Sequence, residues 1–287
     1  MPLAQTSTAR DVDWPVVGGI AAMHLGCVLA PFHVTAGAVW VMVALIWLAG
    51  GVGVTLGFHR LLTHRSFRCP LWLEHGLTVL GCLSWQGGAI QWVGTHRLHH
   101  QSPDRDEDPH SPRHGFLWSH MLWPMLKEPA GRCAADAAKD LARDPVHRFL
   151  DHWFWVPQAL LVPVLYALGG LPWVVWGIFV RTTIVYHGTW LVNSAGHRFG
   201  YRNFDTRDDS GNVWWVALLT FGEGWHNNHH AHQSAAAHGV RWFELDLTYA
   251  QIRLLGLLRL ARGITPHSGL TRRPLRGSEP VPRSSEC

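Results

Sequence analysis

The feature that most limits the fold of this chain is a pair of long apolar segments near its N-terminus. Residues 14–33 and 37–58 contain no Lys, Arg, Asp or Glu. Each is close to the length of about 20 residues that a helix needs to cross the hydrocarbon core of a bilayer. The connection between them is only a few residues long, and Pro31 and Gly37 lie around it, so the two segments are predicted to form a helical hairpin.

A second hairpin is predicted much later in the chain, from residues 153–169 and 172–193. Gly170 and Pro172 separate its two apolar runs, and the second run contains one charge, Arg181. A guanidinium in lipid is costly, so Arg181 is expected to face protein or water. The predicted fold class is an all-α integral membrane protein with four transmembrane helices in two hairpins.

The distribution of basic residues predicts how these hairpins are oriented. The sequence has no Lys or Arg between Arg10 and Arg60, and none between Arg148 and Arg181, so both hairpin loops are uncharged. By the positive-inside rule, both termini and the long segment 59–152 are expected in the cytoplasm.

A single membrane domain is predicted over residues 14–262, with a helical cytoplasmic cap formed by residues 59–152 and 194–262. Residues 1–13 form a polar tail without the apolar core of a signal peptide. Residues 263–287 are rich in Pro, Arg and Ser and are predicted to be disordered. Within the cap, one or two helices are expected over 71–93, in the membrane interface or buried, and an interfacial helix over 248–262.

Composition supports a membrane protein and leaves one residue type unexplained. Charged residues make up 15% of the chain, against about 25% in typical globular proteins. The 17 tryptophans suit the headgroup region of a bilayer, but the 21 histidines need a chemical reason. The net charge of +4 is not concentrated in a stripe, so no nucleic acid partner is expected. The five cysteines are widely spaced, which argues against a disulfide framework or a cysteine metal site and favours a reducing compartment.

Nine histidines fall into clusters next to the predicted spans. They are His59 and His64; His96, His99 and His100; His197, four residues after Asn193; and His226, His229 and His230. Residues three and four apart share a face of a helix, so each H-x-x-H-H triplet is predicted to converge on one point. Neutral imidazole is a good ligand for first-row metals. Because nine imidazoles exceed what one ion binds, a histidine-rich dinuclear site is predicted.

Other metal chemistries fit the sequence less well. The H-E-x-x-H motif of many zinc hydrolases is missing, and a membrane haem protein would place single histidines deep within its spans. Soluble di-iron carboxylate proteins need four helical glutamates, whereas this chain offers only Glu107-x-x-His110 and Glu223-x-x-His226. Ten further histidines are not counted as ligands. His24, His33, His75, His187 and His267 are interpreted as packed or solvated side chains, and the following lie near the clusters but lack paired spacing: His110, His114, His120, His232 and His238.

Taken together, these motifs resemble the membrane fatty acid desaturases, specifically the Δ9 branch acting on acyl-CoA. The resemblance covers roughly residues 12–262 and is carried by GFHRLLTHRSF, WVGTHRLHHQ, DEDPHSPRHGFLWSHMLW, NSAGH and GEGWHNNHHAH. It implies two iron ions in the cap. One ion would be held by His99, His197, His226 and His230, with Asn193 reaching it through a water; the other by His59, His64, His96, His100 and His229.

The resemblance also implies the reaction, an O2-dependent introduction of a cis double bond, at the Δ9 position, into a saturated long chain. Two Fe2+ ions are the expected cofactors, O2 is the co-substrate, and no catalytic residue beyond the metal ligands is expected. Electrons would come from a separate ferredoxin or cytochrome b5-like protein with its reductase. Animal relatives usually carry Arg-Asp immediately before the second box, where this chain has Gly94 and Thr95. The sequence therefore leaves the acyl carrier open. We expect CoA first, and acyl carrier protein and an intact membrane lipid are the alternatives.

Two rival functions remain at this point. A hydroxylase of acyl chains or alkanes would use the same site, and a metal transporter would need ligands near the middle of the bilayer.

Four carboxylates are candidates to accept hydrogen bonds from the imidazole nitrogens that do not bind metal; the alternative is that they are charged side chains on surface loops. They are Asp106, Asp108, Asp205 and Glu223. Trp92 and Trp225, beside the boxes, are candidates to line an acyl tunnel or to pack in the core.

Overall fold

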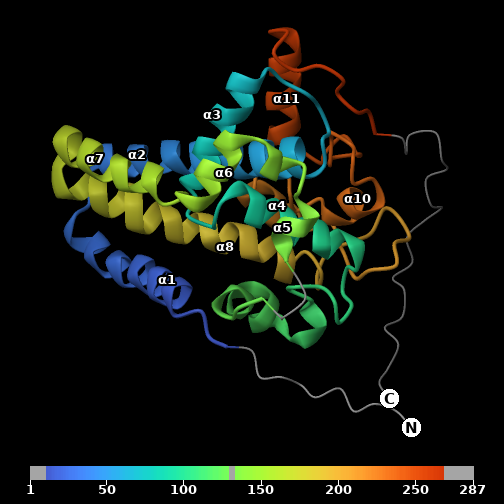
Figure 1. The fold of residues 1–287 in the computed structure, drawn as a ribbon, viewed down its shortest axis with the longest axis horizontal. Coiled ribbons are helices and arrows are strands. Elements are labelled where there is room, and N and C mark those ends of the chain that lie inside the picture. The colour runs from blue at the N-terminus through green and yellow to red at the C-terminus, as the bar shows by residue number, and fades with distance from the viewer. Residues whose placement is uncertain (1–10, 129–132, 268–287) are drawn as a thin grey trace.

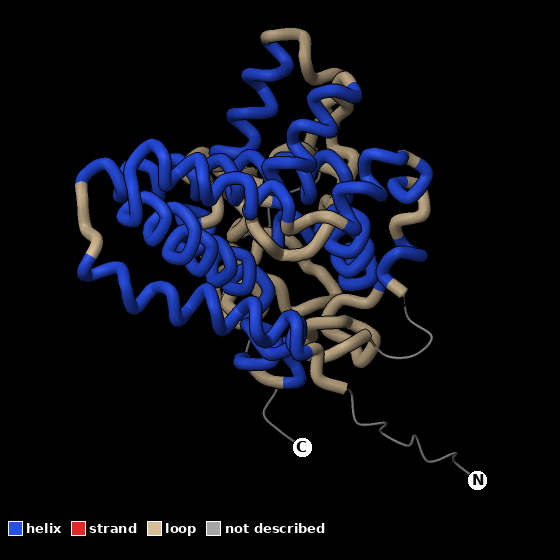
Figure 2. The backbone as a smooth tube through the Cα atoms, turned by 60° about the vertical axis from the view of Figure 1, so that its left-hand side comes forward, coloured by secondary structure: helices blue, strands red, loops and turns tan. Residues whose placement is uncertain are grey.

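The computed structural model describes residues 11–128 and 133–267, and every regular element in these ranges is a helix. Figures 1 and 2 show the resulting bundle of helices and connecting loops. Extended backbone pairing within the described ranges is limited to isolated bridges, such as that between Arg68 and Arg262. The all-α prediction is thus confirmed for the described residues. The predicted tails, residues 1–13 and 263–287, lie mostly outside them.

Three helical stretches of the described chain are long and apolar enough to cross a membrane: Trp14–Phe32, Ala36–Thr63 and Val156–Ser194. The first two form the predicted N-terminal hairpin. They comprise α1 (Trp14–Gly26), the 3-10 helix η1 (Cys27–Phe32), α2 (Ala36–Ile46) and the π-helix η2 (Trp47–Thr63).

Side-chain caps begin both helices of this hairpin. Asp13 accepts a hydrogen bond from the Val16 N–H at 3.3 Å, and Thr35 accepts one from the Ala38 N–H at 3.1 Å. Such caps satisfy backbone donors that a helix start leaves unpaired.

The third stretch, Val156–Ser194, contains 39 residues. As one straight helix it would be about 58 Å long, nearly twice the thickness of the hydrocarbon core. It is not straight, because Gly170 has φ +64° and ψ −160°, outside the helical region. The chain turns back there, inside α7 (Val156–Val174). Residues 156–169 therefore run opposite to the π-helix η7 (Val175–Val180) and α8 (Arg181–Ser194) that follow (Figure 1).

Arg181, the one charge in this stretch, is fully buried in protein, as expected. Its guanidinium donates to the carbonyls of Gly177, at 2.9 Å, and Leu83, and to the Gln158 side-chain oxygen, at 2.5 Å. The guanidinium therefore ties α7 and α8 to the backbone at Leu83.

Shorter helices connect and follow the two hairpins. The segment predicted as one or two helices over 71–93 holds α3 (Leu71–Cys82) and the first part of α4 (Ala89–Gln101). The predicted helix near the C-terminus is α11 (Leu247–Leu257). The others are η3 (Pro112–His114), η4 (Trp118–Leu122), η5 (Trp123–Met125), α5 (Ala134–Ala137), η6 (Leu141–Arg143), α6 (Pro145–His152), α9 (Trp214–Leu219) and α10 (His226–Ala231).

One apolar core fixes two of the histidine-bearing elements, η2 and α4, relative to each other. Phe58 of η2, Leu77 of α3, Val93 of α4 and Ile252 of α11 are buried in the same cluster. Burial of each such side chain contributes about 1.5–3 kcal/mol. Glycine permits the close packing of η2 on α3, since a Cβ at Gly53 would lie 2.4 Å from a backbone nitrogen of α3. Phe58 and Val93 anchor the helices that carry His59 and His96.

Candidate metal centre

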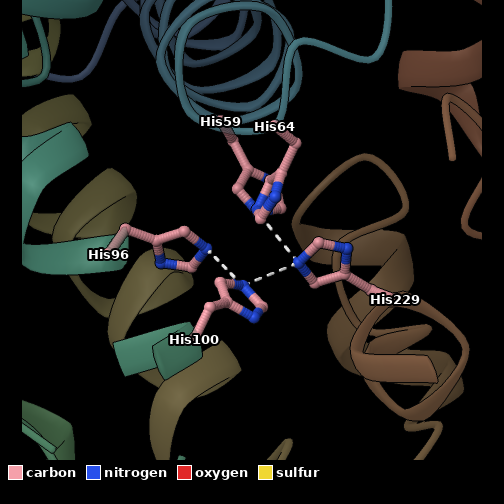
Figure 3. Close-up of side chains that lie close together, drawn as sticks. All are labelled: His59, His64, His96, His100 and His229. Carbon is pink, nitrogen blue, oxygen red and sulfur yellow. Dashed lines mark hydrogen bonds between the residues drawn. The ribbon is translucent and has the colours of Figure 1, made fainter. Parts of the chain in front are cut away.

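The structure brings the nine clustered histidines together in two neighbouring groups. The groups are His59, His64, His96, His100 and His229, and His99, His197, His226 and His230. Within each group, one ring nitrogen from every histidine lies within 4.8 Å of the others. We call them the five-histidine group, shown in Figure 3, and the four-histidine group.

In the five-histidine group the Nε2 atoms point at one another. The Nε2–Nε2 distances are 3.2 Å for His59 and His229, 3.1 Å for His59 and His64, 3.0 Å for His96 and His100, and 3.0 Å for His100 and His229. Figure 3 shows the rings entering from three separate segments, η2 and its end, α4 and α10.

The four-histidine group is built in the same way. The Nε2 atoms of His197 and His226 are 2.9 Å apart, and those of His99 and His230 are 3.3 Å apart. All four side chains are buried. His197 follows the end of α8, so the second hairpin contributes to this group alone.

Local helix geometry explains which histidines pair. His64 follows His59 by five residues, and its N–H donates to the His59 carbonyl at 3.1 Å, which closes the wide turn at the end of η2. This turn places both rings over the same point.

The expectation that each H-x-x-H-H triplet converges on one point is wrong. His96 and His100 belong to one group and His99 to the other, and in α10 His229 separates from His226 and His230. A helix turns about 100° per residue, so residues i and i+4 diverge by only about 40°, whereas i+3 and i+4 diverge by about 100°. Each triplet therefore serves both groups, in the division that the resemblance implied.

Four buried carboxylates accept hydrogen bonds from the opposite ring nitrogens. The Nδ1 atoms of His59, His99, His197 and His230 lie 2.6, 2.8, 3.0 and 3.1 Å from Glu223, Asp108, Asp104 and Asp208. An imidazole that donates from Nδ1 presents the lone pair of Nε2 to the centre of its group. Such contacts fix the orientation of metal-binding histidines and raise their basicity.

Sequence reasoning found only half of these carboxylates. Asp108 and Glu223 were predicted, but the candidates Asp106 and Asp205 are exposed at the surface. The other two carboxylates that contact clustered histidines are Asp104 and Asp208, which were not predicted. Nothing in the sequence distinguishes these acids from their neighbours, because the irregular loops that carry them have no periodicity from which burial could be inferred.

Two further histidines, which spacing had set aside, lie directly behind the groups. Glu223 contacts His238 at 3.3 Å as well as Arg60 at 3.0 Å, and Asp108 is 3.5 Å from His110. All are buried. Arg60 also donates to Asp246 at 2.8 Å, so Glu223 belongs to a connected and buried network of charges.

Burial keeps most of the clustered rings neutral. Burial first, and then neighbouring imidazoles, hold the pKa values of His96, His100, His226 and His229 well below the ordinary value of 6.5. Although burial acts in the opposite direction, His99 and His110 hold the pKa of Asp108 below its usual range. Neutral imidazoles backed by ionised carboxylates are the protonation states that bind metal.

The donor set fits two first-row transition metal ions. An imidazole nitrogen lies about 2.0–2.1 Å from such an ion, and two nitrogens at right angles around it are then about 3 Å apart. The observed Nε2 separations of 2.9–3.3 Å agree with this spacing. Nitrogen-only donors suit iron, zinc, copper or nickel rather than magnesium or calcium.

Two cavities meet beside these groups. The larger, of about 740 Å³, and the smaller, of about 70 Å³, share Trp92, His96, Thr189 and Asn193 in their linings. Asn193 is buried next to the histidines, and Trp92 lines both cavities as proposed for it. Trp225 lines neither; it is buried and donates to the Leu245 carbonyl at 2.8 Å.

A hydrogen-bonded side-chain bridge crosses the junction of the two cavities. The Gln86 amide donates to the Thr189 hydroxyl at 3.0 Å, and its oxygen accepts from the Trp92 indole at 3.1 Å. The bridge fixes the shape of the passage next to His96.

Gly94, two residues before His96, replaces the Arg that animal relatives usually carry there. The fold leaves no room for a side chain at this position, because a Cβ would lie 1.9 Å from the Ala134 carbonyl oxygen.

Comparison with known proteins agrees with this site. Residues 37–259 match the family model described as fatty acid desaturase. The chain is 49% identical to the sn-1 stearoyl-lipid 9-desaturase of Anabaena variabilis, over 90% of this chain and 96% of that protein. It is 43% identical to the sn-2 palmitoyl-lipid 9-desaturase of Nostoc sp. strain 36, over 93% and 96%. It is also 42% identical to an acyl-CoA 5-desaturase of Anemone leveillei, over 91% and 81%.

Proposed function

Because this chain belongs to the fatty acid desaturase family and is therefore an oxidoreductase, we propose that it introduces a cis double bond at the Δ9 position of a saturated acyl chain carried by a membrane lipid. The sequence favoured acyl-CoA first. The relatives from Anabaena variabilis and Nostoc sp. are desaturases of lipid-bound stearoyl and palmitoyl chains by name, which supports the lipid alternative instead.

The five-histidine and four-histidine groups would each hold one iron ion. Two bound iron ions would supply the O2-dependent oxidation of unactivated C–H bonds, which no acid or base side chain can perform. The residues of this chain orient the imidazoles that would bind the iron ions. Glu223, Asp108, Asp104 and Asp208 fix four imidazoles through Nδ1, which directs the Nε2 atoms of these rings toward the two groups.

The two cavities give the acyl chain a path past the metal groups. The chain would enter through the 740 Å³ cavity, pass His96 and Asn193, and end in the smaller one. Ile46, Val185 and Phe221 give the smaller cavity an apolar lining, which suits part of an alkyl chain. The bridge of Gln86, Thr189 and Trp92 lies where the two cavities share their linings, so it would help to hold the reacting carbons beside His96.

The four predicted crossings remain the best account of the membrane topology. The break at Gly170 supports two crossings within Val156–Ser194, and the uncharged hairpin loops support a cytoplasmic site and cytoplasmic termini. A separate electron donor, a ferredoxin or cytochrome b5-like protein with its reductase, would then reach the site from the cytoplasm.

The observation that carries this function is the convergence of nine imidazole Nε2 atoms in two neighbouring groups beside a cavity of about 740 Å³. The test is expression in a host without unsaturated fatty acids, followed by mass spectrometry of each lipid class. A lipid-linked chain with a cis double bond at carbon 9 is the expected product. An alcohol without any alkene would instead identify a hydroxylase.

A further inference from the structure

The four-histidine group has carboxylates behind most of its rings. Three of its four imidazoles have a carboxylate at Nδ1. These pairs, at 2.8, 3.0 and 3.1 Å, are His99 with Asp108, His197 with Asp104 and His230 with Asp208. All three carboxylates are buried, and none of them forms an ion pair with a lysine or arginine in the described part of the chain. Their negative charge is therefore not balanced by a permanently cationic side chain.

The five-histidine group has fewer such contacts. Within the described residues only one of its rings, His59, has a carboxylate partner, which is Glu223 at 2.6 Å. The Nδ1 atoms of His100 and His229 are buried and have no hydrogen-bond partner among those residues. Although it has one ring more, this group is supported by one carboxylate instead of three.

Arg60 reduces the negative charge beside the five-histidine group further. It pairs with Glu223 at 3.0 Å and with Asp246 at 2.8 Å, and all three side chains are buried. Two carboxylates and one guanidinium carry a net charge of −1, whereas the three aspartates of the four-histidine group carry −3. The surroundings of the two groups thus differ by two negative charges.

This difference changes the oxidation state of iron that each group favours. Opposite charges attract more strongly where water is excluded, so buried carboxylates stabilise the ion of higher charge. The three aspartates would balance Fe3+ to neutrality, whereas the net charge beside the five-histidine group would leave Fe3+ with an excess positive charge. Carboxylates at Nδ1 also make imidazoles more basic ligands. Both effects favour Fe3+ in the four-histidine group and Fe2+ in the five-histidine group.

The exposure of the rings indicates where electrons enter. All four side chains of the four-histidine group are buried, whereas His64 and His100 of the five-histidine group are partly exposed. Neither ring lines the two cavities beside the site, so their exposed edges lie outside the proposed acyl path. The five-histidine group is therefore the one that an external electron donor approaches more closely.

Building on the iron sites of the function proposed above, we propose that Asp104, Asp108 and Asp208 give the iron of the four-histidine group a lower reduction potential than the iron of the five-histidine group. Each ion takes up one electron from the external donor on going from Fe3+ to Fe2+. The first electron resides in the five-histidine group and the second in the four-histidine group. The three aspartates act through the histidines that they contact, so they are positioning residues.

The test measures the oxidation state of each ion separately, in crystals of the full chain loaded with excess iron. The crystals are brought to stepwise lower potentials with dithionite and redox mediators. Low-dose anomalous diffraction across the iron edge then gives an absorption edge for each site. The edge of the five-histidine site is expected to reach its ferrous position first. The equilibrium constant for moving one electron between the sites should be at least about 100-fold from unity, equivalent to about 118 mV at about 59 mV for each tenfold step.

A single charge removal links this difference to the aspartates. Asp108→Asn keeps the size of the side chain behind His99 but removes its charge, so the potential of the four-histidine site should rise. We expect the constant to move toward unity by at least about tenfold. Asp106→Asn is the matched control, because it removes the same charge from an exposed position two residues earlier in the same loop. The control should leave the constant unchanged.

Simultaneous reduction of the two ions, or earlier reduction of the four-histidine site, would overturn the proposal. An unchanged constant in Asp108→Asn protein that retains both ions would do so as well, as would an equal change in the control. If the variant loses iron, the order of reduction in the unmodified chain decides. Protein that cannot be loaded with two redox-active iron ions would instead reject the iron sites on which the proposal rests.

Discussion

Glu223 and His59 make the shortest of the four carboxylate contacts to the clustered histidines, with 2.6 Å between Oε2 and Nδ1. The same carboxylate contacts Arg60 at 3.0 Å and His238 at 3.3 Å, and the whole arrangement is buried. Glu223 thus directs the Nε2 of His59 toward the five-histidine group while balancing the Arg60 charge. Mutations of Glu223, and of the other three carboxylates that contact clustered histidines, should therefore reduce metal binding.

Glu223→Gln keeps the size of the side chain but removes its charge. The His59 ring loses its ionised acceptor, so we expect metal affinity and activity to fall about 10–100-fold. Iron content after dialysis against a chelator, measured by mass spectrometry, checks this. Asp205→Asn is the control, since Asp205 is exposed and should tolerate the change. Full iron retention in Glu223→Gln would show that the contact does not support the metal.

Asp104→Asn and Asp208→Asn should act on one iron only. Both carboxylates contact histidines of the four-histidine group, His197 and His230. We expect the double variant to lose the iron of this group and to keep that of the five-histidine group, giving about half of the original iron content. Equal loss of both ions would mean that these carboxylates stabilise the whole fold rather than one site.

Gly188→Leu should shorten the acyl path. Gly188 lines the smaller cavity, where a Cβ would just reach Thr220 at 3.6 Å, so a leucine would project into the apolar end. Loss of room for one or two methylenes changes selectivity about 10–200-fold, so the ratio of palmitoyl to stearoyl desaturation should rise by at least about tenfold. Gas chromatography of competing substrates measures this ratio. Gly76→Leu, at an exposed helical glycine with open space around it, should leave it unchanged.

Metal-free protein should lose stability as the pH falls below about 6.5. Burial lowers the pKa of His230 to about 4, and lowers those of His96, His100, His226 and His229 as well. In this range the unfolded chain binds more protons than the folded one, so the free energy of unfolding decreases with decreasing pH, by up to about 1.4 kcal/mol per pH unit for each histidine. Thermal unfolding of chelator-treated protein between pH 7.5 and 5 measures the slope. A melting temperature independent of pH would contradict the neutral state of the rings.

The sequence predicted the parts of this structure that rest on strong patterns. Long uncharged runs identified the membrane helices, because few alternatives bury so many consecutive apolar residues. Gly170 and Pro172 located the turn of the second hairpin. The paired spacing of the histidines identified the nine that form the two groups but not His110 and His238 behind them, and the family resemblance divided the nine between the groups.

The parts that failed depend on three-dimensional context. Asp104 and Asp208 are in irregular loops, where burial has no sequence period, so they could not be distinguished from the exposed Asp106 and Asp205. Trp225 is next to a box but points into the core, because its indole satisfies the Leu245 carbonyl. The triplets split between groups because the histidines at i+3 and i+4 are neighbours in the sequence and point about 100° apart on a helix.

Anomalous diffraction at the iron edge from crystals of the iron-loaded protein tests the central claim most directly. Two peaks are predicted, one among His59, His64, His96, His100 and His229 and one among His99, His197, His226 and His230. A single peak, or peaks away from these rings, would contradict the account.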